Sequence, residues 1–486
     1  MDELTMRTIS CAHLIADASG AVASEQQIAI DGDRIAAVGP LSAGRADPLL
    51  ALPALVNAHD HGRSVRTSSI GASGKPLESW IHYLTLFPSI DPYLAASVAL
   101  SRTALGGVGT VMMHYTRAQG FTDLPTEVAE VARAARDVGV RVGFAVSMKD
   151  RNPLVYGPSE PLLAALPADV RAEITARYVK PPLTPRALVE LADAVAAAAA
   201  GPGFEVQYGP NGVQWCSDGL LAAIAEASAR TGRRIHMHLL ETRYQRAWAD
   251  QNLPGGIVRH LDAIGLLSPR LSLAHCVWAR PDELELLAER GVTIALNTSS
   301  NLVLRSGIAP LGTMIAKGCR VALGLDAGAI DDDDDALREL RLAHLLHVGT
   351  GFKVAVGRDA MLRLAFANGR LAVTSVDDGG AIAPGAPADL LLLDWAALDD
   401  DRLRDDIDVL DLLMARVTAR HVRELIVGGR SIVRDGKVLG VDYPAARAEV
   451  IARTRAGMAA NGALARALPA LERALAADFE PDCPCC

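Results

Sequence analysis

Between about residues 52 and 373, short apolar runs rich in β-branched residues alternate with longer stretches rich in Ala and Leu. The short runs predict buried parallel strands and the longer stretches predict helices. Eight strands are expected, at residues 54–57, 110–114, 140–147, 204–208, 234–239, 271–275, 293–297 and 320–326. Helices are expected between them, for example at residues 125–138, 185–200, 217–231 and 281–290. This repeated alternation predicts an α/β fold, a parallel (β/α)8 TIM barrel, although a doubly wound sheet would give the same pattern.

The pattern changes at both ends of the chain, where short alternating runs flank tight-turn residues. Such runs lie at residues 27–31 and 34–38, and again at 389–393, 424–427 and 431–433. Gly32-Asp33 and Asp435-Gly436 supply turns typical of paired strands. We expect both ends to pair into one small composite β-sandwich. The expected boundaries are 1–52 and 377–445 for its two parts, 53–376 for the barrel, and 446–486 for a C-terminal helix and a Cys-containing tail.

Composition narrows the class of protein. The chain has 486 residues, of which 50% are hydrophobic, and a net charge of -9 without a basic stripe, so we expect no nucleic-acid partner. The longest apolar stretch, near residues 195–200, is too short for a membrane span, and the first residues do not form a signal peptide. Seven cysteines, an odd number, indicate a reducing cytoplasm. A small-molecule substrate is the partner that remains.

The first expected barrel strand runs into Asn57-Ala58-His59-Asp60-His61. Residues two apart on a strand face the same side, so His59 and His61 would aim two imidazoles at one point. Imidazole nitrogen is a good ligand for zinc, iron and other divalent transition metals. The position at the end of an apolar run predicts a metal site there.

A second HxH motif, His236-Met237-His238, ends the fifth expected strand, and Glu241 follows three residues later. His238 is the favoured ligand because it lies nearer the end of the strand, whereas His236 fits a hydrogen-bonded histidine inside the barrel. Glu241 is suited to general acid–base catalysis, although a carboxylate that begins a helix would look the same.

His275 ends the sixth expected strand and Asp326 the eighth. A carboxylate at the end of a buried strand is costly unless it is paired or binds a metal, which favours Asp326 as a ligand. Three imidazoles and a carboxylate would leave one coordination position for a water molecule, whose pKa the ion lowers. His275 arrives at the same end of the barrel and is expected to act there.

These residues, in this order, resemble those of the amidohydrolase superfamily, in its branch of triazine hydrolases, cytosine deaminase-like enzymes and adenosyl-nucleoside deaminases. The resemblance extends over nearly the whole chain, because residues 32–35, 52–59, 385–390, 427–430 and 435–437 match the family's β-sandwich segments. It implies a TIM barrel with that composite domain, and an assembly that is a homodimer or a larger homo-oligomer.

The resemblance also implies a role for each site residue. His59, His61, His238 and Asp326 match the metal ligands, Glu241 the proton-shuttling glutamate, and His275 the histidine that contacts water or substrate. Relatives with two metals carry a carboxylated lysine after the fourth strand, and this chain has none there. One divalent ion is therefore expected, zinc first, with iron, manganese or cobalt as alternatives.

Substrate contacts are expected from residues near the same end of the barrel. The candidates are His114, Trp80, Gln214, Ser299 and Asn301. His114 is equally consistent with a structural role. Asp60, between the first two histidines, departs from the Thr, Ser or Cys that is commoner in this branch.

The expected reaction is hydrolytic deamination of a nitrogen heterocycle such as an aminopyrimidine, purine, pterin or triazine. Asp326 and His275 would assist the attack of water, and Glu241 would protonate the ring nitrogen and the leaving ammonia. Hydrolysis of an amide, urea or carbamate-type C–N bond with the same site is the alternative, and a metal-binding barrel without catalysis is a third hypothesis. The aspartates at 331–335 are expected to form a solvated helix start, or to meet a basic group of the substrate. The tail after residue 481 is expected to be disordered.

Overall fold

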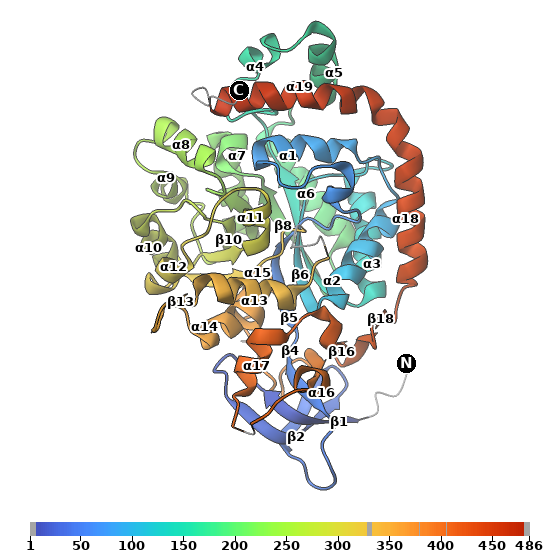
Figure 1. Ribbon diagram of the computed structural model, residues 1–486. Helices are drawn as coiled ribbons and strands as arrows, with labels where there is room; N and C mark the ends of the chain where they lie inside the picture. The colour runs from blue at the N-terminus through green and yellow to red at the C-terminus, as the bar shows by residue number, and fades with distance from the viewer. Residues whose placement is uncertain (1–5, 328–332, 379, 405, 481–486) are drawn as a thin grey trace.

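The protein is described by a computed structural model that covers residues 6–327, 333–378, 380–404 and 406–480. At its centre lies an eight-stranded parallel sheet in which neighbours in sequence are neighbours in space (Figure 1). Its strands are β5 (Leu55–Asp60), β6 (Val108–Tyr115), β7 (Arg141–Met148), β8 (Phe204–Pro210), β9 (Ile235–Leu239), β10 (Leu271–His275), β11 (Thr293–Leu296) and β12 (Arg320–Leu323). The expected (β/α)8 barrel is confirmed.

Helices surround the sheet and end where the sequence provides caps. The larger ones are α2 (Pro92–Leu105), α3 (Leu124–Val138), α6 (Pro185–Ala199), α7 (Asp218–Thr231), α8 (Arg243–Asn252), α10 (Pro281–Glu289) and α13 (Ala336–His347). Asp123 caps the first turn of α3, and Gly139 ends it in a left-handed conformation. Ser217 and Gly232 do the same for α7. Because the caps are local, the helix boundaries lie within a residue or so of those expected from the sequence.

The expected eighth strand, 320–326, is too long: β12 ends at Leu323. Asp326 and Ala327 have left-handed backbone conformations, with φ of 56° and 47°. The backbone N–H groups of Leu325 and Asp326 donate to the carbonyl of His59, at 3.1 and 2.8 Å. These bonds bring the chain after the last strand against the first strand and thereby place Asp326 beside His59.

The amino end of the barrel is closed by α15 (Asn368–Thr374). Val373 of this helix packs with Val56, Met112 and Ala145 in one buried cluster. A Cβ atom at Gly369 would lie 2.7 Å from Val56, so the helix can approach this closely only with glycine there. With this end filled, the opposite, carboxyl end of the strands is the one available for a site.

The two chain ends form a separate β domain below the barrel, as expected (Figure 1). Its sheet has the order β18-β17-β16-β15-β4-β1-β2-β3. The strands are β1 (Arg7–Ile15), β2 (Val22–Asp31), β3 (Arg34–Pro40), β4 (Leu49–Pro53), β15 (Leu390–Asp394), β16 (Val422–Val427), β17 (Arg430–Arg434) and β18 (Lys437–Val438). Antiparallel pairing of β15 with β4 joins the two halves. The sequence patterns did not show β1 and β4.

The chain ends in two helices, α18 (Tyr443–Met458) and α19 (Gly462–Phe479), where one was expected. Figure 1 shows α18 running along the barrel and α19 crossing over its end beside α1 (Leu77–Tyr83). Glu472 of α19 accepts hydrogen bonds from Lys75 and from the hydroxyl of Tyr83. Among the described residues, no helix is both long enough and apolar enough to cross a membrane.

Candidate functional site

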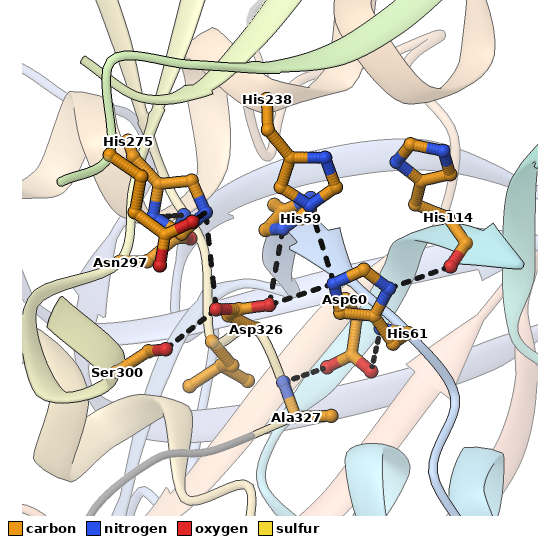
Figure 2. Close-up of polar contacts among 12 residues, drawn as sticks. His59, Asp60, His61, His114, His238, His275, Asn297, Ser300, Asp326 and Ala327 are labelled. Carbon is orange, nitrogen blue, oxygen red and sulfur yellow. Dashed lines mark hydrogen bonds and ion pairs between the residues drawn. The ribbon is translucent and has the colours of Figure 1, made fainter. Parts of the chain in front are cut away.

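Five side chains from the carboxyl ends of four strands meet in one cluster (Figure 2). His59 lies in β5, His61 directly after it, His238 in β9 and His275 at the end of β10. Asp326 follows β12. Its Oδ1 lies 3.2 Å from Nε2 of His59 and 3.0 Å from Nε2 of His61, while Nε2 of His238 lies 3.4 Å from Nε2 of His61. The structure therefore brings together every residue for which the sequence predicted a ligand role.

The second nitrogen of each imidazole is held by the surrounding protein. Nδ1 of His61 lies 2.8 Å from the carbonyl of His114, and Nδ1 of His238 lies 2.8 Å from the carbonyl of Asn211. Because a carbonyl only accepts, each Nδ1 carries the hydrogen, and each Nε2 presents a lone pair to the cluster.

His59 is oriented by the deeper histidine, His236. Nδ1 of His59 lies 2.7 Å from Nε2 of His236, whose Nδ1 lies 2.7 Å from the hydroxyl of Ser272. That hydroxyl donates to the carbonyl of Ile235, so it accepts from His236. The chain of bonds leaves the lone pair of His59 on Nε2. His236 is thus a buried, hydrogen-bonded histidine that contacts His59.

The electrostatics of this cluster fit a cation. Burial lowers the pKa of His59 to about 3, and it lowers the pKa of His238 well below the ordinary value, so both imidazoles are neutral. The neutral Nε2 lone pair of His59, 3.2 Å from a carboxylate oxygen of Asp326, would repel that oxygen. Among the described residues, Nε2 of His59 and of His275 are buried without a hydrogen-bond partner. The donor set matches a divalent ion bound by imidazole and carboxylate.

Three overlapping sets of side chains could hold the ion: His59, His238 and His275; His59, His61 and Asp326; and Glu241, His275 and Asp326. Within each set, the ligand atoms lie within 4.8 Å of one another. The sets share His59, His275 or Asp326, so they describe one centre. These residues support a divalent metal site.

The backbone around the centre adopts conformations that are uncommon for residues other than glycine. Leu240, His275, Cys276, Asp326 and Ala327 all have φ between 47° and 77°. They lie at the carboxyl ends of β9, β10 and β12, where the chain turns sharply to present its side chains. Such strain often accompanies functional sites, because the surrounding fold has to maintain it.

Glu241 lies at the edge of the centre. Its Oε2 is 3.5 Å from Nε2 of His275, and its Oε1 accepts a hydrogen bond from Ser306. Burial raises the pKa of Glu241 well above the ordinary value, and the carboxylates of Asp326 and Glu78 raise it further. A carboxyl group in this environment holds its proton to a higher pH than an exposed one, which suits it to donate a proton.

Asp60 is a structural residue of the site. Its carboxylate accepts hydrogen bonds from the side chain of Asn57, from the backbone of His61 and from Ala327 (Figure 2). It therefore ties the end of the first strand to the turn after the last one. A hydroxyl or thiol at this position would accept fewer of these bonds.

The metal centre forms part of the wall of a cavity of about 260 Å³. His61, His238, Glu241, His275 and Asp326 line it on one side. The other side is formed by apolar, polar and basic residues, namely Arg63, Leu77, Trp80, Ile81, His82, Leu84, Thr85, Thr116, Arg117, Lys149, Pro153, Tyr178, Asn211 and Trp215. The sequence predicted Trp80 on this wall, and the structure places it there.

The other four expected substrate residues are buried and lie off the described wall of this cavity. His114 stacks on His61 and His238, and its Nε2 lies 3.0 Å from the carbonyl of Gly209. Asn301 accepts from Nδ1 of His275 at 2.9 Å. The backbone N–H of Ser299 donates to Glu339, and Gln214 lies in a short 3-10 helix. All four lie at or after the carboxyl ends of barrel strands, in β6, in the short 3-10 helix and in α11 (Thr298–Val303), but their side chains are buried.

Sequence reasoning missed the basic residues Arg117 and Lys149. Each follows a barrel strand, β6 or β7, at the end where barrel enzymes place their functional side chains. The position of Lys149, directly after an apolar strand, was the available signal.

Two residues of the aspartate run, Asp334 and Asp335, are not part of a solvated helix start. Asp331 and Asp332 lie outside the described residues, but Asp334 and Asp335 are buried, with 2% and 5% of their surfaces exposed. Asp334 pairs with Arg102 at 2.8 Å, and Asp335 caps α13. Their charges are thus satisfied within the fold, which corrects the expectation of a solvated run. The Cys-containing tail, 481–486, also lies outside the described residues.

Comparison with known proteins gives a family match and related enzymes. The model of the amidohydrolase family matches residues 50–432. A 5'-deoxyadenosine deaminase from Methanosarcina barkeri is 35% identical over 240 residues, which are 49% of this chain and 54% of that relative. The chain thus spans about half the length of this relative. A 5-methylthioadenosine/S-adenosylhomocysteine deaminase from Moorella thermoacetica is 28% identical over 460 residues, 90% of this chain and 97% of that one.

Solved structures share the fold. A variant of atrazine chlorohydrolase TrzN from Arthrobacter aurescens, in complex with zinc and atraton, superimposes with a TM-score of 0.76 at 22% identity, covering 93% of this chain and 99% of that one. An adenosine deaminase from Xanthomonas campestris with bound zinc gives a TM-score of 0.73 at 22% identity, covering 93% and 98%. At this level of identity, the similarity establishes the barrel with its β domain.

Proposed function

The chain belongs to the amidohydrolase family, and from this premise we propose that it is a metal-dependent aminohydrolase that releases ammonia from a nitrogen heterocycle. The observation that carries the proposal is the position of the buried Glu241 carboxyl group beside the metal centre, on the wall of a cavity large enough for a ring. The relatives named as deaminases of adenosine-type compounds support this reaction.

His59, His61, His238 and Asp326 would hold the ion. When bound, it lowers the pKa of a water molecule and so supplies a nucleophile at neutral pH. Zinc is the proposed metal, because imidazole and carboxylate ligands suit it and because two solved relatives contain it. One ion is proposed, since the possible ligand sets overlap.

Glu241 supplies the acid that deamination needs. An amino group on an aromatic ring leaves as ammonia only after the ring nitrogen and then the amine have been protonated. Glu241 lies on the cavity wall, where its carboxyl group, whose pKa burial raises, can deliver a proton to the ring nitrogen. The carboxylate can then take up a proton released by the attacking water and pass it to the amine, so that each protonation uses a separate proton.

His275 would help to orient the attacking water. Nδ1 lies 2.9 Å from Oδ1 of Asn301 and 3.2 Å from Nδ2 of Asn297, and the shorter contact favours a hydrogen on Nδ1 and a lone pair on Nε2. Nε2 lies 4.0 Å from Oδ2 of Asp326 and faces the cavity. His275 and Asp326 therefore offer two acceptors that fix the orientation of an attacking water. Asp326 is held in place by the hydroxyl of Ser300 at 2.6 Å.

The test combines a substrate panel with the change Glu241→Gln. Wild-type protein with zinc is expected to release ammonia from a member of a panel of aminopyrimidines, purines, pterins and triazines. In Glu241→Gln, kcat is expected to fall about 10²- to 10⁴-fold while the metal content stays unchanged. Glu205→Gln is the matched control, because Glu205 lies in β8 at the opposite end of the barrel.

Near wild-type turnover by Glu241→Gln with full metal content would contradict the shuttle role. If only amides, ureas or carbamates were cleaved, giving amine and acid products, the reaction would be the alternative C–N hydrolysis.

We also propose that the protein acts in the cytoplasm and that it forms a homodimer or a larger homo-oligomer. Size-exclusion chromatography with light scattering tests the second of these.

A further inference from the structure

The cavity wall carries three basic side chains, Arg63, Arg117 and Lys149. The carboxylates on the described wall are Glu241 and Asp326, and both lie in the metal centre. The protein as a whole is acidic, with a net charge of -9, so the basic side chains here are not a general property of its surface. With a divalent ion in place, the lining is distinctly positive.

Arg117 and Lys149 follow neighbouring barrel strands, and both line the cavity. They follow β6 and β7, which pair in parallel with Tyr115 opposite Val146. Arg117 comes two residues after Tyr115, and Lys149 comes three after Val146. The register of the two strands therefore brings the two backbone segments to the same end of the barrel, from which both side chains reach the cavity wall.

Arg63 has a different role. Its Nη1 donates to the backbone carbonyl of Asp326 at 2.9 Å, and its guanidinium lies over the ring of Trp80 at 4.6 Å. These contacts fix the loop that carries Asp326 and one aromatic wall of the cavity. The positive charge of Arg63 adds to the positive potential of the cavity, but its guanidinium group already makes contacts within the protein.

Arg117 and Lys149 have no carboxylate partner among the ion pairs of the described residues. Arg117 donates Nη2 to the backbone carbonyl of Phe87, which orients the guanidinium and leaves its charge unneutralised. Lys149 is exposed and is one of the residues that line the cavity. Surrounding protein atoms lower the pKa of both groups, although an arginine remains charged. An anion beside Lys149 would favour its charged form again.

We propose that Arg117 and Lys149 form a subsite for an acidic group of the substrate, a carboxylate or a phosphate, so that the ring placed at the metal centre belongs to an anionic compound. Trp80 and Trp215 on the same wall provide aromatic surface for that ring. The identification of this compound as the one deaminated rests on the proposed function, whereas the anion subsite itself does not.

Benzenesulfonate and methyl phenyl sulfone test the subsite without turnover. Both probes have a phenyl ring and a sulfur bearing oxygens, both are poor metal ligands, and they differ in charge. Their binding to the zinc-loaded full chain can be followed by calorimetry or by the fluorescence of Trp80 and Trp215. Benzenesulfonate is expected to bind about ten- to a hundredfold more tightly, as for a hydrogen bond to a charged group.

Variants connect this preference to the two residues. Lys149→Met and Arg117→Met should each reduce the preference about tenfold, and Lys149→Arg should retain most of it. Lys353→Met is the matched control, because Lys353 is an exposed lysine in the β-hairpin of β13 (Gly349–Thr350) and β14 (Lys353–Val354). Melting curves identify any variant that fails to fold.

Equal binding of the two probes to the wild type would overturn the proposal. A preference that survives in the Lys149→Met and Arg117→Met variants would also overturn it, because the sulfonate would then be binding at the metal. If the preference follows the two residues but no heterocycle on the panel releases ammonia, the subsite stands and the proposed function falls. If neutral heterocycles are deaminated but benzenesulfonate is not preferred, the proposed function stands and the subsite falls. For the natural substrate, the same variants should raise KM far more than they lower kcat, and panel members carrying a carboxylate or a phosphate distinguish the two acids.

Discussion

His236 should control the affinity of the metal centre without belonging to it. Its Nε2 accepts from Nδ1 of His59 at 2.7 Å, and this bond is the reason that His59 presents a lone pair on Nε2. The change His236→Phe keeps a ring of similar size but removes the acceptor. The buried Nδ1–H of His59 then loses its partner, and the imidazole is free to rotate or to change tautomer.

The expected magnitude follows from that single contact. A buried donor that loses its partner costs about 1–3 kcal/mol. Replacement of residues that orient metal ligands lowers metal affinity about 10- to 100-fold, or about 1.4–2.8 kcal/mol. The two ranges agree, so the Kd for zinc in His236→Phe should rise by that factor. Ser272→Ala, which removes the next bond in the chain, should have a smaller effect.

Competition with a coloured zinc chelator measures this Kd directly. His13→Phe is the matched control, because His13 lies in β1 of the separate β domain, where its ring contacts Trp395 edge-on. This control should leave the zinc Kd unchanged. An unaltered Kd in His236→Phe would refute the view that the hydrogen bond to His59 prepares the ligand.

Two further predictions concern buried charges. Arg102→Ala leaves Asp334 buried without its ion-pair partner at 2.8 Å, so the free energy of unfolding should fall by about 3–5 kcal/mol in urea titrations, and a loss under about 1 kcal/mol would contradict this. Burial raises the pKa of Glu339 from 4.5 to about 7, so the folded protein keeps a proton that the unfolded chain releases, and stability should fall as the pH rises between these values. The free energy of unfolding of Glu339→Gln should therefore exceed that of the wild type by up to about 3 kcal/mol at pH 8, and this difference should disappear below pH 4.5. A difference that does not depend on pH would refute the raised pKa of Glu339.

The metal centre could be predicted from the sequence because each of its residues ends a recognisable apolar run. A buried strand has a clear signature, and in a parallel barrel all strand ends meet at one face. His59, His238 and His275 needed only that rule. The helix limits at Asp123 and Gly139 were equally local, since caps depend on neighbouring residues.

Features that depend on distant partners could not be predicted in this way. Asp334 looked like part of a solvated acidic run, but its partner Arg102 lies 232 residues away in sequence. His114, at the end of the second barrel strand, and Asn301, after the seventh, were expected to contact the substrate, because both positions are near the mouth of the barrel. The direction of a side chain depends on backbone turns and on partners that the pattern does not encode. The course of α19 across the end of the barrel is likewise set by its tertiary contacts, such as that of Glu472 with Lys75.

Ammonia release from an aminoheterocycle, with and without the metal, tests the central claim most directly. Protein dialysed against a chelator should release no ammonia above the background rate, and one equivalent of zinc per chain should restore turnover. Asp326→Asn should lose both the bound zinc and the activity. Turnover that persists in the metal-free protein, or a zinc-loaded protein that releases no ammonia from any heterocycle on the panel, would contradict the assignment of this site as a metal-dependent aminohydrolase centre.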